Sequence, residues 1–171
     1  GHNVQYNYIT DQVWDGILLG QGVVGDNTIA NNVLVDVGKL DASSTDGGAG
    51  LHIEVTVPDS YTGTTPANVI HCYNNTFVNC GAAGKATAGT FGLRQIAAFT
   101  PDFHNNICYQ ANGLQYLSTG LPPVLVFPTG IAAQWSNNLW FGDGAAPTGD
   151  VSKQTTNPQL VSAVVPYDAR L

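Results

Sequence analysis

The chain has 171 residues, of which 43% are hydrophobic and 10% are charged. This composition provides enough apolar residues for one domain with a core, and it excludes an intrinsically disordered chain. The formal net charge is −7 and only five Lys and Arg residues are present. This excludes nucleic acid as a partner, because phosphate binding relies on positive side chains. No run of about eighteen apolar residues occurs, so no membrane span is predicted.

Five short segments along the chain share one pattern around an asparagine. An apolar residue lies three positions before the asparagine and another lies two positions after it; in four segments a second asparagine directly precedes the first. The asparagines are Asn7, Asn32, Asn75, Asn106 and Asn138, in segments 4–9, 29–34, 72–77, 103–108 and 135–140. A constant pattern at irregular spacing predicts stacked coils of similar cross-section, joined by loops of variable length.

Each coil is expected to contain a strand, an asparagine turn and a second strand. An asparagine in the turn tolerates left-handed backbone angles, and its amide can donate and accept hydrogen bonds along the stack. The apolar residues on both sides of the turn are expected to point to a shared interior. We therefore favour a structural role for the five asparagines over contact with a ligand.

A glycine-led strand follows most copies of the asparagine pattern, at residues 16–19, 50–53, 92–96 and 113–117. In the clearest of these, Leu51 and Ile53 alternate with His52 and Glu54, which is typical of a strand with one buried face. The coils are then expected at about 3–26, 27–67, 68–101, 102–133 and from 134 onward.

This arrangement resembles the right-handed parallel β-helix of the pectate-lyase-like superfamily, in which asparagines at equivalent turns stack into a ladder. The resemblance implies an all-β fold: a single right-handed parallel β-helix domain of about five coils over residues 1–171, in a secreted, extracellular or cell-surface protein. The first residues are already in register with the repeat, and the closing segment 157–171 is similar to those of secreted bacterial β-helix proteins. We therefore expect the domain to lack its N-terminal coils or cap, or to have another chain covering its N-terminal end.

The candidate site lies on the glycine-led strands. If Ile17, Leu51, Leu93 and Leu114 point inward, then the residues that follow them form an outward column of Leu18, His52, Arg94 and Gln115, with Glu54 nearby. The resemblance points to a polysaccharide as partner, and a base, a carboxylate and a cation serve a polysaccharide lyase or a glycosidase. The catalytic candidates are therefore His52, Glu54 and Arg94, and the substrate-binding candidates are Gln115, Tyr116 and Lys39.

Two alternatives stay open at this point. His52, Glu54 and Arg94 can form an ordinary solvated sheet face with a surface ion pair. The whole chain can also be a non-catalytic structural, adhesin or tailspike-like module, since function belongs to sites and not to folds.

Neither the acidic residues nor the cysteines show the spacing of a metal site. Calcium stays open as a cofactor, because Asp11, Asp15 and Asp26 or Asp41 and Asp46 can contact it together with backbone carbonyls, although solvated loops are the simpler interpretation. Cys72 and Cys108 occupy core positions of the pattern, whereas the direction of Cys80 is not fixed by it. Free thiols are favoured over a disulfide.

Overall fold

The computed structural model describes residues 1–20, 25–39, 48–54, 68–82, 89–94, 99–111, 113–114, 116–117, 134–147, 149–150 and 152–160. Within these ranges the regular secondary structure consists of β-strands alone, and every pairing between strands is parallel. The described part of the chain therefore contains no helix that could cross a membrane. The expectation of an all-β, parallel architecture is confirmed.

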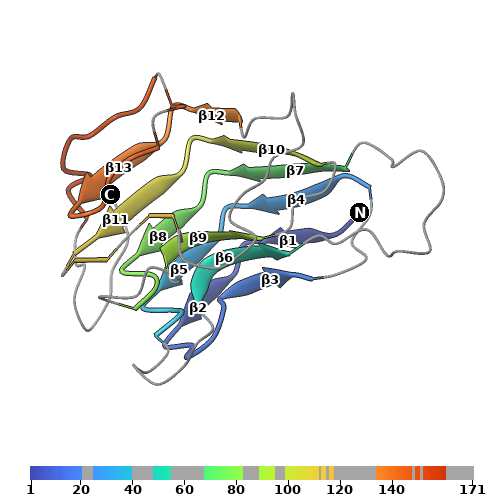
Figure 1. Cartoon of the computed structure of the whole chain (residues 1–171), viewed down its shortest axis with the longest axis horizontal. Coiled ribbons are helices and arrows are strands. Elements are labelled where there is room, and N and C mark those ends of the chain that lie inside the picture. Colours follow the sequence, from blue (N-terminus) through green and yellow to red (C-terminus); the bar gives the residue numbers. More distant parts are fainter. Residues whose placement is uncertain are drawn as a thin grey trace.

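The strands form three sheets, which we call sheets A, B and C (Figure 1). Sheet A contains, in order, β1 (Asn3–Gln5), β4 (Asn27–Ala30), β7 (Asn68–Tyr73), β10 (Phe99–His104) and β12 (Gln134–Ser136). Sheet B contains β2 (Tyr8–Thr10), β5 (Val33–Val35), β8 (Thr76–Val78), β11 (Ile107–Gln110) and β13 (Leu139–Gly142). Sheet C contains β3 (Ile17–Leu19), β6 (Ala49–Glu54) and β9 (Gly89–Arg94).

The chain visits the sheets in a fixed order. It passes from a strand of sheet A to one of sheet B, and in the first three turns then to one of sheet C, before it returns to sheet A beside its earlier strand. We call each such turn a rung; the first rung is β1, β2 and β3, and the last is β12 and β13. Repeated visits to the same sheets in parallel register are compatible with a β-solenoid.

The core lies between the sheets and is lined by the apolar residues of the asparagine pattern. Ile29, Cys72 and Phe103 pair in line on sheet A, and each has 0% exposed surface. The equivalent residues of sheet B, Leu34, Phe77 and Cys108, are also in line and fully buried. Sheet C contributes Phe91, whose ring contacts the rings of Phe77, Phe103, Trp135 and Trp140.

In the bend between sheets A and B, the patterned asparagine and the residue before it have different structural roles. The residue before each patterned asparagine takes the left-handed conformation, with φ between 55° and 59°: Tyr6, Asn31, Asn74, Asn105 and Asn137. The expectation that the patterned asparagine itself takes this conformation was wrong. Left-handed angles cost about 1 to 2 kcal/mol for most residues and least for glycine and asparagine, which explains why four of the five preceding residues are asparagine.

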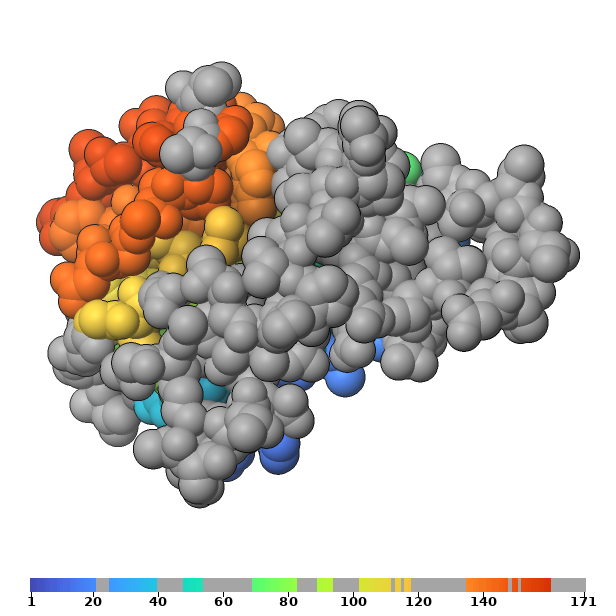
Figure 2. Space-filling model, viewed as in Figure 1, coloured from blue at the N-terminus to red at the C-terminus, as the bar shows by residue number. Residues whose placement is uncertain are grey.

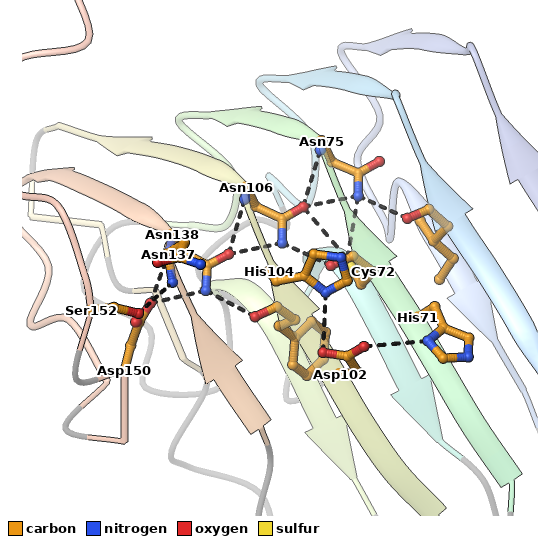
Figure 3. A network of polar contacts seen from close by, with 12 residues as sticks. His71, Cys72, Asn75, Asp102, His104, Asn106, Asn137, Asn138, Asp150 and Ser152 are labelled. Carbon is orange, nitrogen blue, oxygen red and sulfur yellow. Dashed lines mark hydrogen bonds and ion pairs between the residues drawn. The ribbon is translucent and has the colours of Figure 1, made fainter.

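The side chains of the patterned asparagines bind one another across the rungs, as Figure 3 shows for Asn75, Asn106 and Asn138. The side-chain amide of Asn7 donates to Oδ1 of Asn32 at 2.9 Å, Asn32 to Asn75 at 2.9 Å, Asn75 to Asn106 at 3.0 Å, and Asn106 to Asn138 at 2.9 Å. The backbone N–H of each donor residue reaches the same oxygen, at 2.9 to 3.1 Å. We call this line of side chains the amide row.

Two of the glycine-led strands need glycine because sheet C passes close to the core residues of sheet B. An added Cβ on Gly16 would lie 2.7 Å from Leu34 Cδ2, and one on Gly50 would lie 2.9 Å from Phe77 Cδ1. These distances are shorter than carbon atoms tolerate. Gly92 is not equivalent to them, since an added Cβ there would meet Ala49 and the ring of His52.

Candidate functional site

The predicted outward column on sheet C is broken by a shift of two residues. Leu51 pairs with Phe91 and not with Leu93, and Leu93 pairs with Ile53. In the fourth glycine-led segment, 113–117, the backbone of Leu117 and not that of Leu114 pairs with Phe91. The expected stacking of Leu51, Leu93 and Leu114 was therefore wrong.

The shift changes which catalytic candidates are neighbours. His52 pairs with Leu18, as expected, but on its other side it pairs with Gly92 and not with Arg94. Arg94 pairs instead with Glu54. The structure describes only the backbone of Glu54 and Arg94, and Gln115 lies outside the described residues. Their proposed catalytic and substrate-binding roles stay predictions.

His52 is buried, with 6% of its surface exposed. Its Nδ1 lies 2.9 Å from Oδ2 of Asp15, and Oδ1 of Asp15 accepts the backbone N–H of Ala49 at 2.8 Å. Nε2 of His52 is buried and has no hydrogen-bond partner within the described ranges. The expectation of a solvent-facing His52 was wrong, because Asp15 binds the ring at one nitrogen and the ring lies beside Gly92, where an added Cβ would be 3.3 Å from it.

The two described candidates for substrate binding do not join His52. Tyr116 is 1% exposed and packs edge-on against Trp140. Its pKa is raised above the usual range because burial removes water from the phenol. Lys39 is half exposed and forms an ion pair with Asp36, between Nζ and Oδ1 at 2.6 Å. The structure thus assigns Tyr116 to the core and leaves Lys39 on the surface, in the segment that follows sheet B.

Two of the calcium candidates, Asp11 and Asp15, have other partners. Asp15 binds Ala49 and His52, as above, and Asp11 accepts a hydrogen bond from the hydroxyl of Thr10 at 2.9 Å. Within the described ranges no three His, Cys, Asp or Glu side chains come together as metal ligands. Asp41 and Asp46 lie outside the described residues.

A polar cluster that the sequence analysis did not single out lies on the outward face of sheet A (Figure 3). Oδ2 of Asp102 lies 3.3 Å from Nδ1 of His71, and Oδ1 of Asp102 lies 3.1 Å from Nδ1 of His104. The side chains are 28%, 39% and 29% exposed, respectively, so solvent and ligands can reach them. We call these three residues the His–Asp–His cluster.

Tyr73 completes the cluster on one side. Its ring stacks on that of His104, with centroids 5.1 Å apart and planes inclined by 8°. The pairing of β7 with β10 explains both contacts, since His71 is opposite Asp102 and Tyr73 is opposite His104. Because Cys72 and Phe103 point to the core, strand alternation turns the residues on either side of them outward.

A sequence signal for this cluster existed. His71 and Asp102 both lie four positions before a patterned asparagine, and Tyr73 and His104 lie two positions before one. Comparing the outward positions of the asparagine pattern, and not only those of the glycine-led strands, would have aligned them. On the outer neighbouring strands, His71 pairs with Thr28 and Tyr73 with Ala30, whereas Asp102 pairs with Gln134 and His104 with Ser136.

The hydrogen bonds constrain the chemistry of the two imidazoles. An ionised carboxylate only accepts, so each histidine offers Nδ1–H to Asp102, and its Nε2 is left to accept or donate a proton according to its charge. A carboxylate that fixes the tautomer and orientation of an imidazole is the arrangement that catalytic Asp–His pairs use. The cluster can therefore bind polar groups and can transfer protons.

The three cysteines are free and buried, which confirms the expectation of free thiols. Burial raises the pKa of Cys80 to about 12 and holds the pKa values of Cys72 and Cys108 well above the ordinary value of a thiol. These groups are therefore core side chains without nucleophilic character.

No protein-family model matches the chain, and no significant match was found among curated proteins or solved structures. The function is therefore argued from the geometry of the chain itself.

Proposed function

We propose that the chain is an extracellular module of the right-handed parallel β-helix type, with the amide row as its internal asparagine ladder, and that it binds a polysaccharide along the outward face of sheet A. The parallel pairing of all described strands and the hydrogen bonds of the amide row support the architecture. The repeated rungs build a long, regular face, which suits a linear polymer.

The His–Asp–His cluster with Tyr73 is the observation that carries the proposal. It offers a carboxylate, two imidazoles and a phenol on an exposed sheet. Sugars are recognised by polar groups that fix their hydroxyls and by aromatic surfaces that cover their apolar C–H faces. Thr28 and Ser136, which pair with His71 and His104, are short and partly exposed, so they leave the cluster open beside these two residues.

The same residues indicate which chemistry would follow binding in an enzyme. A glycosidase uses two carboxylates about 5 to 9.5 Å apart, and among described residues the cluster contains only Asp102. Proton abstraction by an imidazole that a carboxylate orients requires no second carboxylate. The face thus supports a lyase-type reaction better than hydrolysis.

Retention of the protein in gels that contain polysaccharides tests the binding proposal. Tyr73→Ser should weaken retention by at least about tenfold, because it removes the ring beside His104. The matched control is Tyr109→Ser, which removes an outward ring from sheet B, where Tyr109 contacts Phe141. Equal retention of the two variants on every polysaccharide tried, or no retention of the wild-type protein, would refute the proposal.

A second candidate function is a non-catalytic structural or adhesin-like module. It is favoured by the exposed large apolar residues of the first rung, which are typical of a surface that another rung or subunit covers. Wild-type protein that fails to bind any polysaccharide yet retains its fold would favour this candidate.

A further inference from the structure

The first rung differs from all later ones in what it exposes. The exposed large hydrophobic residues of the described ranges all belong to it: Tyr6 at 80%, Tyr8 at 57%, Val13 at 56%, Trp14 at 57% and Leu18 at 54%. Its strands β1, β2 and β3 are the terminal strands of sheets A, B and C. Within the part of the chain that the structure describes, each therefore has a partner strand on one side only, and the three unpaired edges belong to the same rung.

The amide row has a direction, because each asparagine donates to the next one along the chain. Asn7 is its first member, so its hydrogen bonds show which kind of group the edge lacks. The backbone N–H and the side-chain amide of Asn7 both donate to Asn32, and the amide also donates to the carbonyl of Gln5. All strong donors of Asn7 are therefore engaged. Its Oδ1 accepts no hydrogen bond from a described residue, whereas Oδ1 of every later asparagine in the row accepts two N–H groups.

The opposite end of the row is closed. Oδ2 of Asp150 accepts the backbone N–H of Asn138 at 3.2 Å, its amide at 2.9 Å and the indole N–H of Trp140 at 3.0 Å. Gln154 pairs with Leu139 through the backbone and continues sheet B beyond β13. Figure 2 shows the two ends on opposite sides of the molecule, with the first rung blue and residues 134–160 orange to red.

We propose that the exposed edge of the first rung is a docking surface for one further parallel β-rung of the same repeat, outside residues 1–171, whose asparagine donates its N–H and its amide to Oδ1 of Asn7. Val4 and Ile9, which are only partly buried at this edge, become covered in the process. The edges of β1, β2 and β3 add to the same interface.

A second copy of this chain does not fit this role. The first rung of the copy would bring another Asn7, whose donors are already engaged. The last rung of the copy would bring the end that Asp150 closes, which is a carboxylate and offers acceptors only. The donor pair must therefore come from a rung that precedes Asn7 in the direction of the row.

The experiment joins a duplicate of residues 68–99 ahead of Gly1 in the complete chain. These residues carry Asn75, the strands β7, β8 and β9, and the spacing that leads into β10. The proposal expects amide hydrogen exchange in β1 and β2 to slow by about a hundredfold. The matched control carries Asn75→Leu in the duplicate only, and it should lose about tenfold of this protection.

Three results would overturn the proposal or part of it. Exchange in β1 and β2 that the duplicate leaves unchanged would show that the edge does not accept a rung. Sedimentation equilibrium of the 171-residue chain that shows a dimer, abolished by Tyr8→Lys, would show that a second copy covers the edge. Protection that is equal with and without the asparagine would overturn the role of Asn7 Oδ1.

Discussion

Asn138 donates its side-chain amide to Oδ2 of Asp150 at 2.9 Å, and this bond ends the amide row with a carboxylate. Asn32, Asn75, Asn106 and Asn138 each accept from the preceding member of the row and donate to the next one. The last member needs only to accept, and it accepts from Asn138 and from Trp140. An aspartate meets this demand without leaving a donor unpaired in the core.

Replacing Asp150 therefore separates its role as an acceptor from its charge. Asp150→Ala leaves three buried donors without an acceptor, and we expect the free energy of unfolding to fall by about 2 to 4 kcal/mol. Asp150→Asn keeps an oxygen in place and should cost less than half as much. Urea unfolding measures both, and equal losses would contradict the acceptor role.

Five residues directly precede a patterned asparagine in the bends between sheets A and B, and all five have a positive φ. Tyr6, with φ of 59°, is the one of these five that is not asparagine. Tyr6→Asn should raise the free energy of unfolding by about 1 kcal/mol, because asparagine tolerates left-handed angles better than tyrosine. Tyr8→Asn is the matched control: it removes a similarly exposed ring from a residue without a positive φ, and it should bring no gain. A stabilisation of the same size in both variants would point to the lost ring and not to the backbone.

Gly50 is expected to resist even a single added methyl group. The new Cβ would lie 2.9 Å from Phe77 Cδ1 and from the carbonyl oxygen of Thr90, so Gly50→Ala should cost about 1 to 3 kcal/mol. An added Cβ on Gly20 meets no atom within 4 Å, and Gly20→Ala should leave stability within about 0.5 kcal/mol. Thermal unfolding compares the pair, and equal melting temperatures would argue against the close approach of sheet C to sheet B.

The buried thiols predict a loss of stability at alkaline pH. Burial raises the pKa of Cys80 from 9.0 to about 12 in the folded chain, so the folded thiol stays neutral while the unfolded one ionises. The stabilisation is complete below about pH 9 and declines as pH rises from 9 towards 12. Urea unfolding at pH 8 and pH 10 measures this decline, which Cys80→Ala should reduce. Reaction of the native cysteines with a thiol reagent at pH 8, at the rate of unfolded protein, would contradict their burial.

The asparagine pattern predicted the residues of sheets A and B that pair, because it fixes position and direction together. It could not decide which residue of Asn31 and Asn32 takes the left-handed conformation, since asparagine suits both tasks. The register of sheet C escaped prediction for a different reason. A slip of one residue turns every side chain to the other face, but a slip of two preserves the alternation. Leu51 opposite Phe91 and Leu51 opposite Leu93 therefore look equally good in sequence.

The candidate site was missed for related reasons. Alternation predicts that His52 points away from the core, but it cannot show that Asp15, 37 residues earlier, binds the ring from the surface side. The His–Asp–His cluster also joins two rungs, because Asp102 and His104 lie on β10 whereas His71 lies on β7, 31 residues before Asp102. Only alignment of the outward positions of the asparagine pattern reveals such a contact.

Histidine NMR tests the central claim, that a polysaccharide lies on the His–Asp–His cluster. The chain contains four histidines, so His2 and His52 serve as internal controls for His71 and His104. On titration with oligosaccharides from a polysaccharide that retains the protein, we expect the Nε2 resonances of His71 and His104 to shift while those of His2 and His52 stay in place, and Asp102→Asn should weaken the effect at least about tenfold. Shifts at His52 with unchanged resonances of His71 and His104 would contradict the account and place the ligand on sheet C.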